Sequence, residues 1–196
     1  GVAARFLKSK GMKDIALVLD EPFGGGEFAG AAVEGAILGD FEPDRYKTEK
    51  KEQKSLDRFT LVARESKELA EAARRGRIVA ESQNFTRDLV CEPANRLSPS
   101  ILAEKARKMA ADHNLECEIL DADRMRQLGM GALLGVAQGS SEPPALIIVR
   151  YRPGGELKSG AHLGLVGKGV TFDSGGVSIK PSEGMEKMGL CGRSLS

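Results

Sequence analysis

The chain has 196 residues, of which 41% are hydrophobic and 29% are charged, as in an ordinary soluble globular protein of one or two domains. Its 29 basic and 28 acidic residues give a net charge of +1, so no excess of positive charge favours binding to nucleic acid or an anionic membrane. No apolar run approaches the roughly 20 residues that a membrane-spanning helix needs. The 3 widely spaced cysteines argue against a disulfide framework and indicate a reducing, cytoplasmic location.

The first third of the chain predicts a strand, a helix and a second strand. The apolar run DIALVL at 14–19 predicts a buried strand, and AAVEGAILGD at 31–40 predicts a short helix. The segment 44–54 mixes charges of both signs and is typical of a solvated loop or helix face. RFTLVAR at 58–64 predicts the second strand. This order is typical of an α/β layer.

A long helix is predicted to begin after Ser66. Ile78, Phe85 and Leu89 follow one another at steps of seven and four, which place them on one helical face. Such a helix would run for about 24 residues, or roughly 36 Å. Gly76 in its middle costs roughly 1 kcal/mol relative to alanine. Because the far side is polar, the pattern indicates a connector between two domains.

The second half of the chain alternates predicted helices with apolar strands. Ser98 followed by Pro99 is a helix start, with serine as N-cap and proline at the first helical position. The predicted elements are a helix at 99–113, a strand at 115–120, a short helix from Asp121 or Asp123, and strands at 145–151 and 162–167. This alternation predicts a mostly parallel sheet covered by helices on both faces.

The segment GLVGKGVTFDSGGVSIKPSEGMEKM, 164–188, begins at the end of a predicted strand, where open α/β sheets bind ligands. A Walker A loop would need glycine in place of His162 and serine or threonine in place of Gly169. A dinucleotide fingerprint would need glycine in place of Phe172. Neither nucleotide motif is therefore present.

Three charged residues, Lys168, Asp173 and Lys180, lie in this glycine-lined segment. Gly175 and Gly176 permit positive φ and close approach of the backbone. A carboxylate held in such a turn suits a hard divalent cation. The same residues are equally consistent with a structural role, in which the aspartate caps a turn and both lysines are solvated.

The pattern G-K-G-x-T-F-D-S-G-G-x-S-I-K-P resembles the metal-binding segment of the leucyl aminopeptidase, or cytosol aminopeptidase, family. The resemblance runs from Val166 to Met188 and extends more weakly upstream. It implies an α/β fold in three parts. These are the end of an N-terminal α/β domain at 1–66, a linker helix at 67–92, and the first part of a truncated catalytic domain with a mostly parallel sheet at 93–196.

The resemblance also implies two divalent metal ions, manganese or zinc, with Lys168 and Asp173 among the metal ligands. Lys180 matches the catalytic lysine that polarises the scissile carbonyl, and Met188 matches a residue of the substrate-binding pocket. A lysine can bind a metal only as the neutral amine, and a nearby dication lowers its pKa. The catalytic lysine has to stay protonated to stabilise negative charge.

After Met188 the sequence departs from the family pattern, and Cys191 stands where the family has a further aspartate ligand. A later segment with two more carboxylate ligands is absent. We therefore expect an incomplete and inactive piece of a cytoplasmic aminopeptidase. The resemblance implies that members of this family remove N-terminal residues, leucine preferred, from peptides with a free N-terminus. It also implies that they form homo-oligomers, which are hexamers. The alternatives are a non-catalytic oligomer partner and a small-ligand-binding α/β domain without metal.

Overall fold

The computed structural model describes residues 1–20, 22–43, 46, 54–64, 66–152, 154 and 162–183. The chain divides into two compact units, Gly1–Asp88 (unit 1) and Leu89–Ser196 (unit 2). Both combine helices and strands, as the predicted α/β class requires. The three-part boundaries drawn from the sequence stay a prediction. Among the residues described, no helix has the length and apolar character to cross a membrane.

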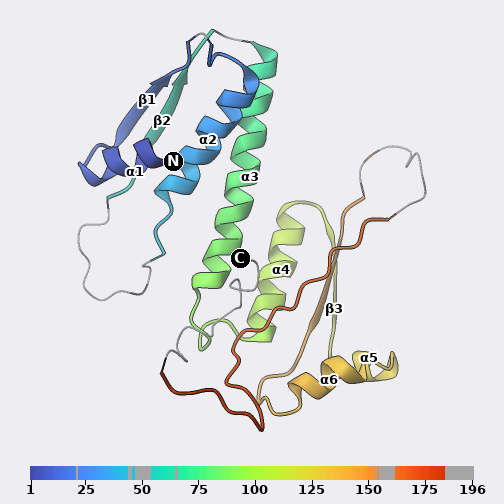
Figure 1. Ribbon diagram of the computed structural model, residues 1–196. Coiled ribbons are helices and arrows are strands. Elements are labelled where there is room, and N and C mark those ends of the chain that lie inside the picture. The colour runs from blue at the N-terminus through green and yellow to red at the C-terminus, as the bar shows by residue number, and fades with distance from the viewer. Residues whose placement is uncertain are drawn as a thin grey trace. The chain divides into compact units, whose positions relative to one another are not determined.

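Unit 1 is built around a parallel pair of strands joined through a helix. Its elements are α1 (Val2–Ser9), β1 (Asp14–Val18), α2 (Gly26–Asp40), β2 (Arg58–Val62) and most of α3 (Lys67–Cys91). Asp14 pairs with Arg58 and Val18 with Val62. Both predicted strands and the long helix, 25 residues in length, are confirmed, but β1 is not buried as predicted, since Leu17 and Val18 are 38% and 66% exposed. The first helix was not predicted. Figure 1 shows α2 and α3 side by side.

Small residues let α2 and α3 approach closely. A Cβ atom added to Gly76 of α3 would lie 2.3 Å from the carbonyl oxygen of Gly30 of α2. Ala29 and Ala80, one on each helix, are fully buried. Ile78 and Phe85 are instead 48% and 38% exposed. The predicted apolar stripe of α3 is therefore not its buried face in unit 1, because the glycine and alanine face permits the closer contact.

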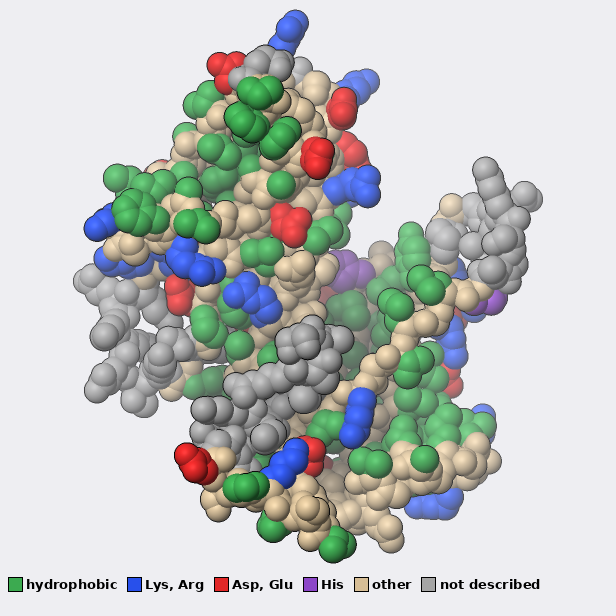
Figure 2. Space-filling view, in the orientation of Figure 1, with side chains coloured by type: hydrophobic (Ala, Val, Ile, Leu, Met, Phe, Trp, Pro, Cys, Tyr) green, Lys and Arg blue, Asp and Glu red, His purple; other side chains and the backbone are tan. Residues whose placement is uncertain are grey.

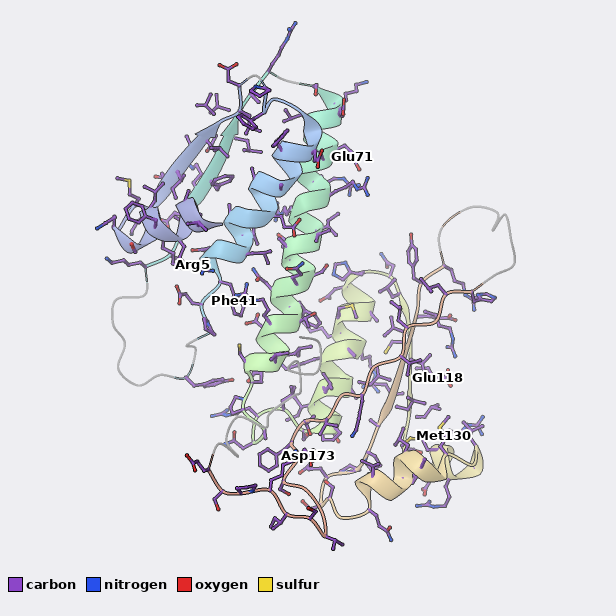
Figure 3. The ribbon with its side chains drawn as sticks, in the orientation of Figure 1. Arg5, Phe41, Glu71, Glu118, Met130 and Asp173 are labelled. Carbon is purple, nitrogen blue, oxygen red and sulfur yellow. The ribbon has the colours of Figure 1, made fainter. Side chains whose placement is uncertain are left out.

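Side chains of α3 also satisfy the last carbonyls of α2, which have no partner inside their own helix. Asn84 Nδ2 donates to the carbonyl of Ile37 at 3.2 Å, and Arg87 Nη1 donates to that of Leu38 at 3.2 Å. The Arg87 guanidinium also lies 4.0 Å from the ring centroid of Phe41, which Figure 3 labels. A cation is favoured at this end of a helix by the helix dipole.

A buried lysine ties α1 to the end of α2. Lys8 is only 4% exposed, and its Nζ lies 3.0 Å from Asp40 Oδ1 and 2.8 Å from Glu42 Oε1. Burial by itself lowers the pKa of Lys8, but hydrogen bonds with Glu42 and Asp40 outweigh burial and raise the pKa above its ordinary 10.5. The ammonium also donates to the Asp40 carbonyl at 2.7 Å.

We expect Lys8→Met to lower the free energy of unfolding of unit 1 by about 1.5–3 kcal/mol, the usual contribution of hydrogen bonds to a charged group. Because the pKa is raised in the folded state, this contribution is complete below pH 10.5 and is lost as pH rises through the folded value. Urea unfolding of both proteins between pH 7 and 11 measures it.

The matched control is Lys13→Met, which removes the same charge from a side chain that is 70% exposed and lies 4.0 Å from Asp57. A surface ion pair of this kind contributes about 0–1 kcal/mol. Equal destabilisation by the two substitutions would contradict a special role for the buried lysine.

Unit 2 contains α4 (Pro99–Asp112), β3 (Glu116–Leu120), α5 (Ala122–Gln127), α6 (Gly131–Ala137) and β4 (Leu146–Arg150). Ser98 is the N-cap of α4, since its hydroxyl accepts a hydrogen bond from the Ile101 N–H. Asp121 caps α5 in the same way, through the Arg124 N–H at 2.8 Å. Both predicted helix starts are confirmed, whereas α6 was not predicted. Leu97 and Met125 are the largest fully buried side chains.

The strands of unit 2 pair antiparallel, where the sequence predicted a mostly parallel sheet. Leu120, the last residue of β3, faces Leu146, the first residue of β4. The short helices α5 and α6 thus connect the end of β3 to the start of β4 at the same edge of the sheet. A parallel pair would need a connection that crosses to the opposite edge. A cross-strand ion pair between Arg150 and Glu118, at 2.7 Å, supports this register.

The predicted strand at 162–167 is absent from the structure, and this prediction is wrong. Leu163, Leu165 and Val166 are almost completely exposed. An apolar run becomes a strand only with a partner for its backbone hydrogen bonds, and no described strand pairs with this one. Figure 2 shows hydrophobic side chains exposed on the visible surface of both units.

Candidate functional site

The segment 162–183 carries the predicted site, with Asp173 labelled in Figure 3. Asp173 Oδ2 lies 2.7 Å from Lys180 Nζ, and the two form an ion pair with a charged hydrogen bond. Asp173 Oδ1 accepts a hydrogen bond from the Gly175 N–H at 2.9 Å. The structure therefore brings two of the predicted residues into direct contact, although they are seven positions apart.

A tight turn makes this contact possible. Gly175 has a φ of +90°, and it forms an isolated antiparallel bridge with Ile179. The Lys180 N–H donates to the Ser174 carbonyl at 2.9 Å. A Cβ atom at Gly175 would lie 2.3 Å from the Ser178 carbonyl oxygen, so glycine is required by both φ and space. This confirms the sequence argument for Gly175.

The electrostatics of the turn keep Asp173 ionised. The hydrogen bond from Lys180 is the largest effect and lowers the pKa of Asp173, and the Gly175 N–H lowers it further. Slight burial acts in the opposite direction, and the charges of Lys180 and Lys168 lower the pKa again. The site is therefore a carboxylate in contact with Lys180, with Lys168 near enough for its charge to act on it.

Lys168 lies at the wall of a cavity of about 550 Å³ within unit 2. Apolar side chains from three elements line this cavity, including Leu102 of α4, Val136 of α6 and Ile147 of β4. Phe172, the neighbour of Asp173, also lines it. No pattern in the sequence signalled this cavity, because its walls come from segments far apart in the chain.

The predicted site residues thus have different outcomes. Asp173 and Lys180 are in contact, Lys168 acts on Asp173 through its charge, and Met188 lies outside the described residues. Asp173 does cap a turn, as the structural alternative held, but Lys180 is ion-paired with it. The roles of these residues as metal ligand and catalytic group stay predictions.

The donor set accounts for only part of a metal site. Asp173 offers a carboxylate and Lys168 an amine, which fit one side of a divalent-ion site. Across the described parts of the chain, no group of 3 or more His, Cys, Asp or Glu side chains could hold an ion. These residues fit a metal centre that further ligands complete.

Comparison with known protein families shows to which family the chain belongs. The model of the cytosol aminopeptidase family catalytic domain matches residues 84–191, which include Lys168, Asp173 and Lys180. The chain belongs to the cytosol aminopeptidase family. The N-terminal domain model of the same family matches residues 1–50. The family resemblance seen in the sequence is thereby confirmed.

Relatives in the cytosol aminopeptidase family are similar along nearly the whole chain. A probable cytosol aminopeptidase of Solibacter usitatus is 65% identical over 188 residues, which are 96% of this chain and 38% of that protein. One from Acidobacterium capsulatum is 45% identical and is covered to the same extent. The chain thus spans somewhat more than a third of the length of these relatives.

Solved structures of similar proteins confirm the α/β fold class. The bottromycin maturation enzyme BotP, in complex with Mn, has a TM-score of 0.79 at 32% identity, over 95% of this chain and 39% of that one. A mutant of tomato leucine aminopeptidase has a TM-score of 0.70 at 29% identity, over 80% of this chain and 32% of that one.

Proposed function

We propose that this chain provides part of the metal centre of a cytoplasmic aminopeptidase that removes N-terminal residues, leucine preferred, from peptides. The observation that carries the proposal is the ionised carboxylate of Asp173, in contact with Lys180 and within the field of Lys168, inside the segment matched by the catalytic-domain model. Its similarity to relatives named as probable cytosol aminopeptidases supports peptide hydrolysis as the reaction.

Each residue has a distinct proposed role. Asp173 and Lys168 would provide some of the ligands for two divalent ions, manganese or zinc. When bound, these ions supply an activated water and an anchor for the substrate α-amine. The neutral amine of Lys168 is its only form with a lone pair for a metal. Lys180 keeps its proton and donates to the carbonyl oxygen as negative charge develops there. Met188 contacts the side chain of the first substrate residue.

The active protein is proposed to be a homo-oligomer, a hexamer as the family resemblance implies. Its substrates are peptides with a free N-terminus.

We expect no detectable turnover from residues 1–196 alone. One carboxylate and one amine among the described residues are fewer ligands than two ions need. Release of p-nitroaniline from leucyl p-nitroanilide, with added manganese or zinc, measures the activity. Clear metal-dependent release that Asp173→Ala abolishes would show that the site is more complete than proposed.

A specific observation favours one alternative, a small-ligand-binding α/β domain without metal. The cavity of about 550 Å³ beside Lys168 has apolar walls and lies within the range of small-molecule sites, about 300–1,000 Å³. Metal analysis of the purified chain separates the two functions. Metal bound in a way that depends on Asp173 supports the aminopeptidase and contradicts the metal-free alternative.

A further inference from the structure

Both oxygens of the Asp173 carboxylate have partners within the chain. The Lys180 ammonium lies 2.7 Å from Oδ2, and the Gly175 N–H donates to Oδ1 at 2.9 Å. A divalent ion binds a carboxylate oxygen at roughly 2.0–2.6 Å. The ammonium therefore occupies one of the positions around Oδ2 that an ion could take, and two cations at one oxygen repel each other.

We infer that Lys180 caps Asp173. Its ammonium is a built-in cation that pairs with the carboxylate, and a divalent ion has to displace this ammonium in order to bind. The inference rests on the proposed role of Asp173 as a metal ligand. It adds a second state to that site, in which the catalytic lysine and the metal compete for one oxygen.

The backbone of the turn fixes the position of Lys180, while the exposed side chain can leave Asp173. The bond from the Lys180 N–H to the Ser174 carbonyl, and the bridge between Gly175 and Ile179, fix where the lysine side chain starts. The side chains of Lys180 and Asp173 are 33% and 47% exposed. Water therefore weakens the ion pair, and pairs of this exposure bias an equilibrium only about 1.5- to 5-fold.

This strength suits a displaceable cap. An ion that binds Asp173 releases the Lys180 ammonium, while the turn still holds the lysine backbone beside the site. The ammonium displaced from Asp173 then donates to a substrate carbonyl. One lysine would thus stabilise the metal-free carboxylate and serve the reaction once metal is bound.

Binding of Mn²⁺ to the purified chain, measured by the free-ion EPR signal, tests the cap. Lys180→Met keeps the length of the side chain and removes its charge, and we expect it to bind Mn²⁺ about 1.5- to 5-fold more tightly than the wild type. Lys180→Arg is the matched control, since it keeps a cation opposite Asp173, and its affinity should not exceed that of the wild type. Affinity in Lys180→Met equal to or weaker than in the wild type would overturn the inference.

Asp173→Asn separates this inference from the proposed function. We expect it to weaken Mn²⁺ binding and to cancel the gain when combined with Lys180→Met. If Asp173→Asn weakens binding but Lys180→Met does not tighten it, the ligand assignment stands and the cap is wrong. If Asp173→Asn binds Mn²⁺ as tightly as the wild type, the ligand assignment itself fails.

Discussion

Replacement of Gly76 by alanine is expected to destabilise unit 1 by about 1–3 kcal/mol, the usual cost of an overpacked contact. The added methyl group would lie 2.3 Å from the Gly30 carbonyl oxygen and 2.9 Å from its carbon. Both are backbone atoms of α2, so no flexible side chain can move aside. The two helices have to separate, and the fully buried Ala29 and Ala80 then lose contacts as well.

The sign of this effect is informative. Helix propensity alone predicts that Gly76→Ala stabilises α3 by roughly 1 kcal/mol. The control is Gly135→Ala in α6, where an added Cβ meets nothing within 4 Å. We expect that change to be neutral or stabilising by up to about 1 kcal/mol. Amide hydrogen exchange reports each unit separately, and slower exchange of α2 and α3 in Gly76→Ala would contradict the close crossing.

Gly76 also shows what a single sequence can and cannot predict. The periodicity and the polar residues of 67–91 were enough to predict a long helix, because those signals are local. The face that packs was not predictable from Ile78 and Phe85, since it depends on Gly30, 46 positions earlier in the chain. The cap Ser98 was predicted correctly, and Asp121 was one of the two starts predicted for α5, for the same reason that the helix was, because their hydrogen bonds are made within three residues.

Strand direction and strand formation were harder to predict. The run at 145–151 has the composition of a strand whether it pairs parallel or antiparallel, and the short helix α6 before it decided the direction. The run at 162–167 has the composition of a strand but no partner among the described residues. A propensity is local, whereas a ladder of hydrogen bonds needs a second segment.

In the candidate site, the sequence identified the charged residues but not their pairing. The glycine at position 175 suggested a tight turn, and its φ of +90° confirms it. The contact between Asp173 and Lys180 depends on the bridge from Gly175 to Ile179, which closes the turn and has no signature in the residue types. The cavity beside Lys168 requires three separate elements and could not be predicted at all.

Replacement of Lys180 and replacement of Lys168 in an active enzyme are expected to have different effects on kcat and on metal content. A suitable protein is a chimera in which this chain replaces the matching part of the Solibacter usitatus relative. Lys180→Ala should lower kcat a few hundredfold, since loss of one donor to the developing oxyanion costs about 3–4 kcal/mol. Its metal content should be at or above that of the unsubstituted chimera, because the lysine competes for Asp173 and supplies no lone pair while protonated.

Lys168→Ala should instead weaken metal binding, because the proposed amine ligand is removed. Raising the metal concentration should then recover part of the activity, whereas it should not rescue Lys180→Ala. Metal analysis and steady-state kinetics on both variants measure the difference. Near-normal kinetics in both would support two solvated lysines without a role in the reaction. Equal metal loss in both variants would contradict the distinct roles. Recovery of Lys180→Ala by added metal would contradict them too, because a lysine that donates to the carbonyl oxygen is not needed for metal occupancy.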